Sequence, residues 1–385
     1  MKKVLVLNHF PTVIPPSSGG TLRYFHLYHE LSMYYDITLL SQNTGHKSGL
    51  YRYSPTFKEY KVGLDPKWNK PRFSYEFMLI DHMERSRQIT NYKEYFEKLY
   101  KTNEIIVHES PYLLEVDSYV GRDNKLRIYN SHNHEYRLAQ LVWNDEKARK
   151  FLPTVYELEK RIVEHADVVF ATSKMERESF ISMYKKNPNQ VKIAPNGIYP
   201  HTWRNSTKTF NSKPKAIFIG SEFPPNIEAV QFIIHELAHH CPEIEFVIAG
   251  GCGISFSNHK KTNVQISGRI SQKQKLKLFA SANMAINPMF TGTGVSLKTL
   301  EFLSAGIPLF STKCGVRGLN LTDFKHYIQV EKDQFAAALN QYYTEDKLLE
   351  ELSSNGQEYI NEHYSWKSIA QGIYDEIEKF KPSSQ

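Results

Sequence analysis

Short apolar runs alternate with longer amphipathic segments along the whole chain, and this alternation constrains the fold more than any other feature. In the first half the runs are rich in Val, Ile and Leu and occur at 4–10, 37–40, 104–110, 126–132, 166–172 and 191–197. Strands that are apolar on both faces, joined by amphipathic helices, are typical of a parallel sheet covered by helices on both sides. The first half therefore predicts a doubly wound α/β sheet.

The second half repeats this plan. Its apolar runs occur at 216–220, 245–250, 263–268, 284–288 and 307–312. The polar segment 201–215 separates the two halves, and 385 residues are more than one hydrophobic core usually serves. We therefore predict two Rossmann-like domains that face each other across a cleft, at 1–200 and 201–365, and a C-terminal helix in 366–385 that can pack back on the first domain.

The chain is basic, with 48 Lys and Arg against 41 Asp and Glu and a formal net charge of +7. This charge favours acidic partners. Part of the excess lies in 47–101, where basic residues are mixed with aromatic ones. Such a segment suits an anionic membrane surface or a polyanionic acceptor, and it equally describes a solvated face over a core. No helix-turn-helix, zinc-finger or RNP-type pattern accompanies the charge, so we expect no nucleic-acid partner.

The N-terminus and the length of the apolar runs bear on location. No apolar run reaches the length of about 18 residues that a membrane span needs. The opening MKKVLVLNHF passes into a strand-like segment without a small-residue cleavage site. We therefore expect a cytoplasmic protein, and the basic aromatic segment adds the expectation of peripheral contact at the inner face of the membrane.

The clearest chemical motif is a glycine-rich turn within 284–312, between an apolar run and an amphipathic segment. Gly292 and Gly294 allow backbone conformations that a Cβ would forbid, so the N–H groups that open the next helix can point at one anion. Lys298 lies on the first turns of that helix and can reach the same anion. Glu301 lies one turn further and can accept hydrogen bonds from a ribose. The pattern predicts a nucleotide diphosphate site, although an ordinary turn before a helix shares it.

A second glycine turn follows the first apolar run. It ends in Gly19 and Gly20, just before an amphipathic segment, so an anion could also approach the backbone there. The turn lacks the G-x-G-x-x-G spacing of a dinucleotide fingerprint. We therefore do not expect a hydride-transfer enzyme that uses NAD(P).

The segment SHNHEYR places three polar side chains directly after an apolar run. His132, His134 and Glu135 would then lie at the edge of the sheet where ligands bind in α/β folds. Such residues can orient a sugar hydroxyl or transfer a proton. For His132 we expect a direct role toward the substrate, with a structural role as the alternative.

A different histidine pair matches the H-E-x-x-H pattern of zinc sites. His235 and His239 flank Glu236 in this way, and a zinc site would need the histidine face of the helix to meet a cleft. This segment has the pattern of a crossover helix whose apolar face covers the sheet. We therefore expect no metal there.

In this order and spacing, the motifs resemble the retaining glycosyltransferases of the two-domain GT-B architecture, specifically the family-4 group within the glycosyl transferases group 1. The resemblance covers nearly the whole chain. It is carried by the segments SSGG, SHNHEYR, ADVVFATS, VKIAPNG, AIFIGSEFPPNIEAV, EFVIAGG, QISGRI and TGTGVSLKTLEFLSAGIPLFST. It implies transfer of a sugar from a UDP- or GDP-sugar to an acceptor hydroxyl, with the anomeric configuration retained and without an obligatory metal or other cofactor.

The resemblance also assigns roles in the second domain. Glu301 matches the second acid of the family's E-x7-E element and would bind the donor ribose. The first acid falls on Thr293, so the backbone amides of the Gly292–Val295 loop are expected to hold the diphosphate and the sugar. The family often has a basic pair after the first strand of this domain, where this sequence has SEFPPN. Lys298 would then take over the phosphate charge.

Further roles are implied on both sides of the predicted cleft. Arg269 and Ile270 match the position where the backbone contacts the nucleotide base. His132 matches the region of the family's active-site histidine, and Gly19 and Gly20 match the loop near the β-phosphate and the acceptor.

The implied acceptor is a glycan, a lipid-linked molecule or a small molecule, in glycan, glycolipid or polysaccharide biosynthesis. Two other functions fit the same pattern. A nucleotide-sugar 2-epimerase of similar fold would convert the donor without any acceptor, and a non-catalytic sugar-nucleotide-binding protein would bind without turnover.

Overall fold

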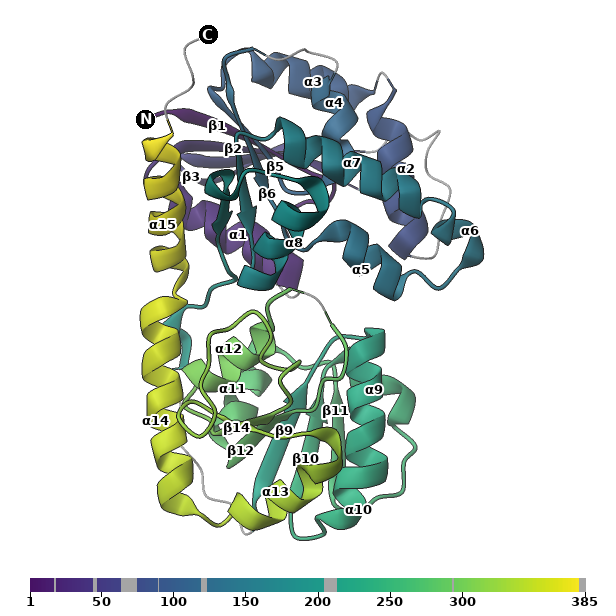
Figure 1. The fold of residues 1–385 in the computed structure, drawn as a ribbon, viewed down its shortest axis with the longest axis vertical. Helices are drawn as coiled ribbons and strands as arrows, with labels where there is room; N and C mark the ends of the chain where they lie inside the picture. The colour runs from purple at the N-terminus through teal and green to yellow at the C-terminus, as the bar shows by residue number, and fades with distance from the viewer. Residues whose placement is uncertain are drawn as a thin grey trace. The chain divides into compact units, whose positions relative to one another are not determined.

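The computed structural model describes residues 1–16, 19–43, 47–63, 75–88, 90–118, 123–203, 213–292 and 294–380. The chain divides into two compact units (Figure 1). Unit 1 contains Met1–Pro195 and the last stretch of the chain from Ile369, and unit 2 contains Asn196–Ser368. Most of the expected linker at 201–215, and part of the basic aromatic segment, lie outside the described residues.

Unit 1 is built on an eight-stranded sheet in the order β3-β4-β2-β1-β5-β6-β7-β8. The strands are β1 (Lys3–Asn8), β2 (Asp36–Asn43), β3 (Gly49–Ser54), β4 (Phe57–Gly63), β5 (Ile105–His108), β6 (Leu126–Asn130), β7 (Val168–Ala171) and β8 (Val191–Ile193). Neighbouring strands are parallel, except that β3 pairs antiparallel with β4 at the edge. Val4, Leu5 and Val6 are all buried, so the central strand contributes to the core on both faces.

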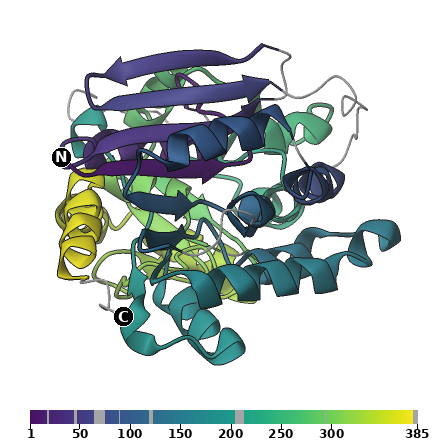
Figure 2. The same cartoon turned by 90° about the horizontal axis from the view of Figure 1, so that it is seen from above.

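Helices cover both faces of this sheet (Figure 2). They are α1 (Gly19–Leu31), α2 (Tyr75–Ser86), α3 (Asn91–Tyr100), α4 (Leu114–Ser118), α5 (Glu135–Val142), α6 (Glu146–Arg149), α7 (Leu152–His165) and α8 (Lys174–Tyr184). One face packs on α3 and α4, where Leu5 and Ile106 meet Phe96. The opposite face packs on α1 and on the last helix, α15 (Trp366–Lys379).

The loop after β1 is tied to the sheet through the carboxylate of Glu59 on β4. Glu59 is fully buried, and it accepts hydrogen bonds from the backbone N–H of Thr12 (3.0 Å), from Ser41 Oγ (2.6 Å) and from Tyr53 OH (2.6 Å). Lys61 Nζ lies 3.6 Å from the same carboxylate and donates to the carbonyl of Thr12 at 2.8 Å. A buried carboxylate is stable only with such partners. Glu59 therefore fixes the path of the chain from β1 toward α1.

Unit 2 contains a six-stranded parallel sheet in the order β11-β10-β9-β12-β13-β14. The strands are β9 (Lys215–Ile219), β10 (Glu245–Ala249), β11 (Val264–Gly268), β12 (Met284–Asn287), β13 (Leu309–Ser311) and β14 (Ile328–Gln329). Counted along this unit, the order is 3-2-1-4-5-6, which is that of a Rossmann sheet. The predicted α/β class with two parallel sheets is thus confirmed.

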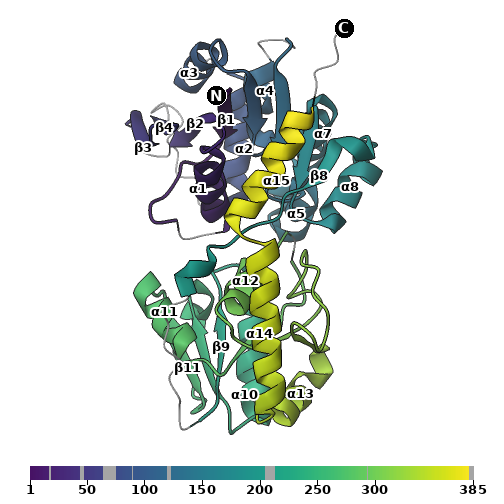
Figure 3. The same cartoon turned by 90° about the vertical axis from the view of Figure 1, so that its left-hand side faces the viewer.

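The helices of unit 2 connect these strands and cover the sheet. They are α9 (Pro224–Phe232), which continues through a π-helical turn (Ile233–Leu237) into α10 (Ala238–His240), then α11 (Gln272–Ala280), α12 (Leu297–Ser304), α13 (Phe335–Tyr342) and α14 (Asp346–His363). The long helix α14 is seen most clearly in Figure 3. It is fixed to the end of α12, because Ser304 Oγ donates to Asn361 Oδ1 at 2.8 Å and Ser353 Oγ donates to the carbonyl of Gly306 at 2.6 Å.

From Ile369, the last helix α15 belongs to unit 1. Ile373 and Ile377 are buried beside the first strands of the unit 1 sheet. The ring of Tyr374 stacks on Tyr34 at 4.5 Å, and Lys2 Nζ lies 2.8 Å from the carboxylate of Glu378. Within the described part of the chain, no helix is both long enough and apolar enough to span a bilayer.

Candidate functional site

In unit 2, two polar side chains meet where the strand order reverses. β9 lies between β10 and β12, so the connections that leave β9 and β12 diverge at their carboxyl ends, which is where α/β sheets bind ligands. Lys298, on the first turn of α12 after β12, donates from Nζ to Oδ1 of Asn226 at 2.7 Å. Asn226 lies on α9, the helix that follows β9. Lys298 therefore bridges the two connections at the ligand-binding edge of the sheet.

The surroundings of Lys298 disfavour its positive charge. Its Nζ lies 4.2 Å from the centre of the Phe218 ring and 3.7 Å from Met289 Sδ, and the side chain is half-buried. This burial lowers the pKa of Lys298 to about 7, and the guanidinium of Arg317 adds to the lowering against the opposing influence of Cys252. An anion bound at Nζ would restore the charge, because an opposite charge favours the ionised form.

The glycine turn before α12 has the backbone that the sequence predicted. Gly292 has a φ of +149° and Gly294 a φ of +67°, both in the region that favours glycine. The side chain of Ser296 makes no capping hydrogen bond to the first turn of α12. The N–H groups that open this helix are therefore not occupied by a side-chain cap and can bind an anion. Thr293 lies outside the described residues, and Val295 is buried in the unit 2 core.

Arg317 packs against this turn. A methyl group on Gly292 would lie 2.6 Å from Cζ of Arg317, so the guanidinium sits directly on the glycine. The loop that carries it is held in place by Asn287 at the end of β12, which donates from Nδ2 to the carbonyl of Gly315 at 2.7 Å and to Thr299 Oγ1 at 3.0 Å. The glycine turn thus has two basic side chains nearby, Lys298 and Arg317.

Three further predicted residues lie on neighbouring elements of unit 2. The carboxylate of Glu301, on the second turn of α12, forms an ion pair with Lys275 Nζ at 2.5 Å. Arg269 follows β11, is 79% exposed, and lies 3.8 Å from the carboxylate of Glu222. Ile270 is half-buried next to it. If a ribose bound to Glu301, the carboxylate would have to interact with both Lys275 and the ribose. The side chain of Arg269 is exposed to solvent.

Unit 1 has a polar cluster at its own reversal of strand order, between β1 and β5. His9, directly after β1, lies with Nδ1 2.9 Å from Oγ of Ser110, which follows β5. Burial lowers the pKa of His9 well below its usual range, and the neighbouring His82 and His132 add to this lowering. His9 is therefore neutral at physiological pH.

His132 lies beside this cluster, after β6, and is held by a buried carboxylate. Its Nε2 donates to Oε2 of Glu109 at 2.5 Å, and its side chain is 11% exposed. Glu109 in turn accepts from Asn130 Nδ2 at 2.7 Å and from the hydroxyl of Tyr28. Because Nε2 is bound to Glu109, Nδ1 is the ring nitrogen left for a ligand.

The second glycine turn meets His132. Gly20 begins α1, and a methyl group on it would lie 3.7 Å from Nδ1 of His132 and 3.4 Å from the ring of Phe10. Gly19, beside it, is exposed. The structure thus brings Gly20 and His132 together in unit 1, and it brings Gly292, Gly294 and Lys298 together in unit 2.

The interpretation of His134 and Glu135 as substrate-facing residues is wrong. The His134 ring is buried and stacks on Phe180 at 4.8 Å, and its Nδ1 lies 3.0 Å from Oε2 of Glu159. Glu135 is also buried and accepts from the hydroxyl of Tyr112 at 3.0 Å. Burial, with the nearby charge of Glu159, raises the pKa of Glu135 to about 8. Both side chains stabilise the core of unit 1.

The H-E-x-x-H segment runs through the π-helical turn of the α9 connection. His235, Glu236 and His239, which form the pattern, are all exposed. Over the ranges that the structure describes, no group of three or more His, Cys, Asp and Glu side chains is arranged to hold a metal ion.

Sequence reasoning missed Asn226 and Arg317. Asn226 follows β9 and reaches Lys298, and Arg317 follows β13 and reaches Gly292, in each case only through the fold. The one local signal is Gly220 at the end of β9, because a methyl group there would lie 2.8 Å from Cγ of Asn226.

Comparison with known proteins shows a family match in unit 2 and a similarity of fold over the whole chain. Residues 213–345, within unit 2, match the family Glycosyl transferases group 1. The fold of the whole chain is the two-sheet GT-B fold of glycosyltransferases, as its similarity to solved structures shows.

Among those structures, sucrose-phosphate synthase from Thermosynechococcus elongatus has a TM-score of 0.77 at 16% identity, covering 98% of this chain and 99% of that chain. HepE of Anabaena, solved in complex with UDP-glucose, has a TM-score of 0.69 at 12% identity, with coverage of 98% and 100%. WaaG, a glycosyltransferase involved in lipopolysaccharide biosynthesis, has a TM-score of 0.66 at 14% identity, with coverage of 97% and 98%.

A curated relative extends the similarity at the level of sequence. The chain is 22% identical over 296 residues, 72% of its own length and 75% of the relative's, to an uncharacterized 44.6 kDa protein in the cps region of Klebsiella pneumoniae.

Proposed function

We propose that this protein is a glycosyltransferase that transfers a sugar from a nucleoside diphosphate sugar to an acceptor hydroxyl, with retention of the anomeric configuration. The observation that carries the proposal is the position of Lys298. Its ammonium lies at the reversal of a Rossmann-type sheet, next to a glycine turn and an uncapped helix, inside the region that matches group 1 glycosyl transferases.

The donor diphosphate is proposed to bind at the glycine turn of unit 2. Backbone N–H groups at the start of α12 would hold its oxygens, while Lys298 and Arg317 balance its negative charge. Glu301 would bind the ribose by exchanging part of its ion pair with Lys275, and Arg269 and Ile270 would contact the base. UDP is the preferred nucleotide in this proposal, because solved relatives of the same fold contain UDP or UDP-glucose.

Departure of the diphosphate is the step that these residues would promote. Negative charge grows on the leaving phosphate oxygens as the glycosidic bond breaks, and positive groups already in position lower the free energy of that transition state. The departing phosphate oxygen is proposed to take the acceptor proton on the same face of the sugar, which gives retention. In this scheme the charge is balanced by protein groups, so we propose that transfer requires no metal ion.

His132 is proposed to orient the transferred sugar. Its ring is held through Nε2 by Glu109, so Nδ1 is left to accept a hydrogen bond from a hydroxyl beside Gly20. Polysaccharide or glycolipid biosynthesis is the proposed setting, supported by a relative in a cps region and by the similarity of fold to WaaG.

The test begins with binding. UDP, GDP and ADP, and their sugars, would be screened by thermal unfolding, since a ligand at about 100 times its Kd stabilises the fold by about 2.7 kcal/mol. Turnover would then be followed as release of the nucleoside diphosphate in the presence of candidate acceptors.

The paired variants are Lys298→Met and, as a control, Lys277→Met at an exposed position of α11. We expect the first to lose about 10²–10³ in turnover and the second to keep wild-type turnover. A folded Lys298→Met protein with more than about a third of wild-type turnover would contradict the proposed role. Conversion of the donor without any acceptor would instead indicate an epimerase.

A further inference from the structure

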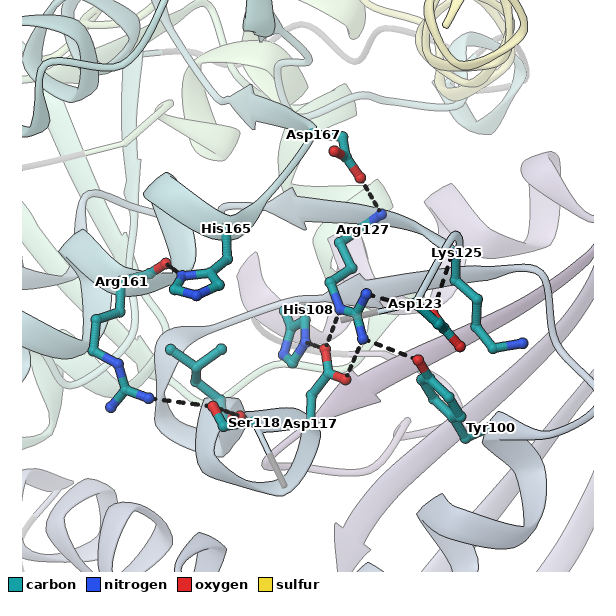
Figure 4. A network of polar contacts seen from close by, with 11 residues as sticks. Tyr100, His108, Asp117, Ser118, Asp123, Lys125, Arg127, Arg161, His165 and Asp167 are labelled. Atoms are coloured by element: carbon teal, nitrogen blue, oxygen red, sulfur yellow. Dashed lines mark hydrogen bonds and ion pairs between the residues drawn. The ribbon is translucent and has the colours of Figure 1, made fainter. Parts of the chain in front are cut away.

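Unit 1 contains a cavity that the proposed transfer reaction does not use. It has a volume of about 240 Å³ and lies against β5 and β6, between α4 and α7 (Figure 4). A dry protein cavity of roughly 150 Å³ already admits a six-membered ring. This cavity is therefore large enough for a six-membered ring with substituents.

The cavity wall contains an orphaned buried nitrogen. His108 lines the cavity and is 2% exposed, and its Nδ1 has no hydrogen-bond partner among the residues that the structure describes. The other nitrogen, Nε2, lies 3.0 Å from Oδ2 of Asp117. A buried polar atom without a partner costs free energy that a ligand would recover.

The neighbours of His108 leave Nδ1 as its free ring nitrogen. Burial alone would raise the pKa of Asp117, but hydrogen bonds and charge from His108 and Arg127 outweigh it and lower the pKa to about 2. Asp117 is therefore ionised and accepts the Nε2 proton of His108. A hydroxyl group both donates and accepts, so it can form a hydrogen bond with Nδ1.

A second imidazole lies at the mouth of the cavity. His165 is exposed at the end of α7, and its Nδ1 lies 2.7 Å from the carbonyl of Arg161, to which it can only donate. Its Nε2 is therefore the ring nitrogen left for a ligand. Figure 4 shows His108 across from Arg161 and His165, which lie next to each other on α7. Two free ring nitrogens around one cavity favour a ligand with several O–H groups, which both donate and accept hydrogen bonds.

The arginines near the cavity are already paired with carboxylates. Arg127 donates to both oxygens of Asp117 at 3.0 and 3.1 Å, and Arg161 donates to Glu115 at 2.5 Å. An inorganic anion would have to compete with these carboxylates. A neutral polar ligand would not, which favours it over phosphate.

Most of the remaining wall, apart from Ser118, is apolar. Leu114, Ile128 and Ile162 line it, and such side chains suit the C–H faces of a sugar ring. We propose that this cavity is a second ligand site of the protein and that it binds a monosaccharide, either free or as one unit of a longer glycan. The site is independent of the glycine turn in unit 2.

The test is binding of methyl pyranosides to the full chain, measured by saturation-transfer NMR and calorimetry with UDP present at saturation. His108→Gln keeps a donor in the place of Nε2 and removes the Nδ1 ring nitrogen, and His165→Leu removes the imidazole at the mouth. We expect at least one glycoside to bind and each variant to weaken it by about tenfold, the usual effect of one hydrogen bond.

Two controls separate this site from the others. His363→Gln, at an exposed position in unit 2, and Lys298→Met should both bind the same glycoside with unchanged affinity. If His108→Gln does not fold, the affinity of His165→Leu for the glycoside tests the proposal, because His165 is exposed. The proposal is overturned if no pyranoside of the panel binds, if binding is the same in folded His108→Gln and His165→Leu, if it disappears in Lys298→Met, or if inorganic phosphate displaces the sugar.

Discussion

Binding of UDP should be coupled to the uptake of a proton by Lys298. In the free protein, burial holds the pKa of Lys298 at about 7, so at pH 8 roughly nine in ten of these side chains are neutral. A diphosphate next to Nζ favours the charged form and returns the pKa toward about 10.4. The complex should therefore take up about 0.9 proton per UDP at pH 8.

The same linkage sets how affinity depends on pH. Between about pH 8 and about pH 10 each increase of one unit makes the free ammonium about ten times rarer, so the apparent Kd should rise there by about tenfold per unit. From pH 7, where half of the side chains are charged, to pH 9 the Kd should rise by about 50-fold. The phosphates of UDP are fully ionised over most of this range and should contribute little.

Calorimetry in two buffers of different ionisation enthalpy measures the proton uptake directly. Lys298→Met should remove both the uptake and the pH dependence, while Lys277→Met should keep them. An uptake below about 0.2 proton at pH 8, with a Kd that stays constant to pH 9, would refute the placement of Lys298 against the diphosphate.

The free energy of unfolding should also depend on pH through Lys298. Because the folded pKa of Lys298 lies below its unfolded value, the folded state binds fewer protons between about pH 7 and pH 10. The free energy of unfolding of wild type, relative to Lys298→Met, should therefore rise with pH across this window, by at most about 1.4 kcal/mol per unit. Urea denaturation of both proteins at about pH 7 and about pH 8.5, roughly the lower half of that window, measures the difference.

Transfer should survive EDTA, because Lys298 and Arg317 are proposed to balance the diphosphate charge; activity that is lost with the chelator and restored by Mg²⁺ or Mn²⁺ would contradict this. His132→Ala should lower turnover by about 10²-fold or more while UDP affinity stays within about twofold, because His132 lies in unit 1 and the glycine turn in unit 2; an equal loss of affinity by calorimetry would argue against the assignment. Glu59→Ala should lower the free energy of unfolding in urea by about 3 kcal/mol or more, because it leaves buried donors unpaired; a loss below about 1 kcal/mol would show that this carboxylate does not hold the loop after β1.

Strands buried on both faces were predictable from the sequence, and the edge strands were not. The runs predicted at 216–220 and 245–250 correspond to β9 and β10, because a parallel strand between two helical layers must be apolar along its whole length. The hairpin of β3 and β4 was not predicted. Leu50 and Tyr51 on β3 are exposed at the edge of the sheet, so the strand has no continuous apolar pattern.

The candidate site was predictable only where it is local in sequence. Gly292, Gly294 and Lys298 lie within one turn and one helix, so their spacing predicted their proximity. Arg317 and Asn226 reach the same place from connections after other strands, which a linear pattern does not contain. His134 was misread for the same reason, since Phe180 and Glu159 come from helices further along the chain.

From Ile369, α15 belongs to unit 1 although it follows unit 2 in the sequence, and this affects how the chain folds during synthesis. Unit 2 is continuous in sequence from Asn196 to Ser368, whereas unit 1 needs the segment from Ile369 to complete its sheet cover. Domains fold as units while the chain emerges from the ribosome. The N-terminal unit is therefore synthesised first but completed last, and its first strands lack the cover of Ile373 and Ile377 until α15 has emerged.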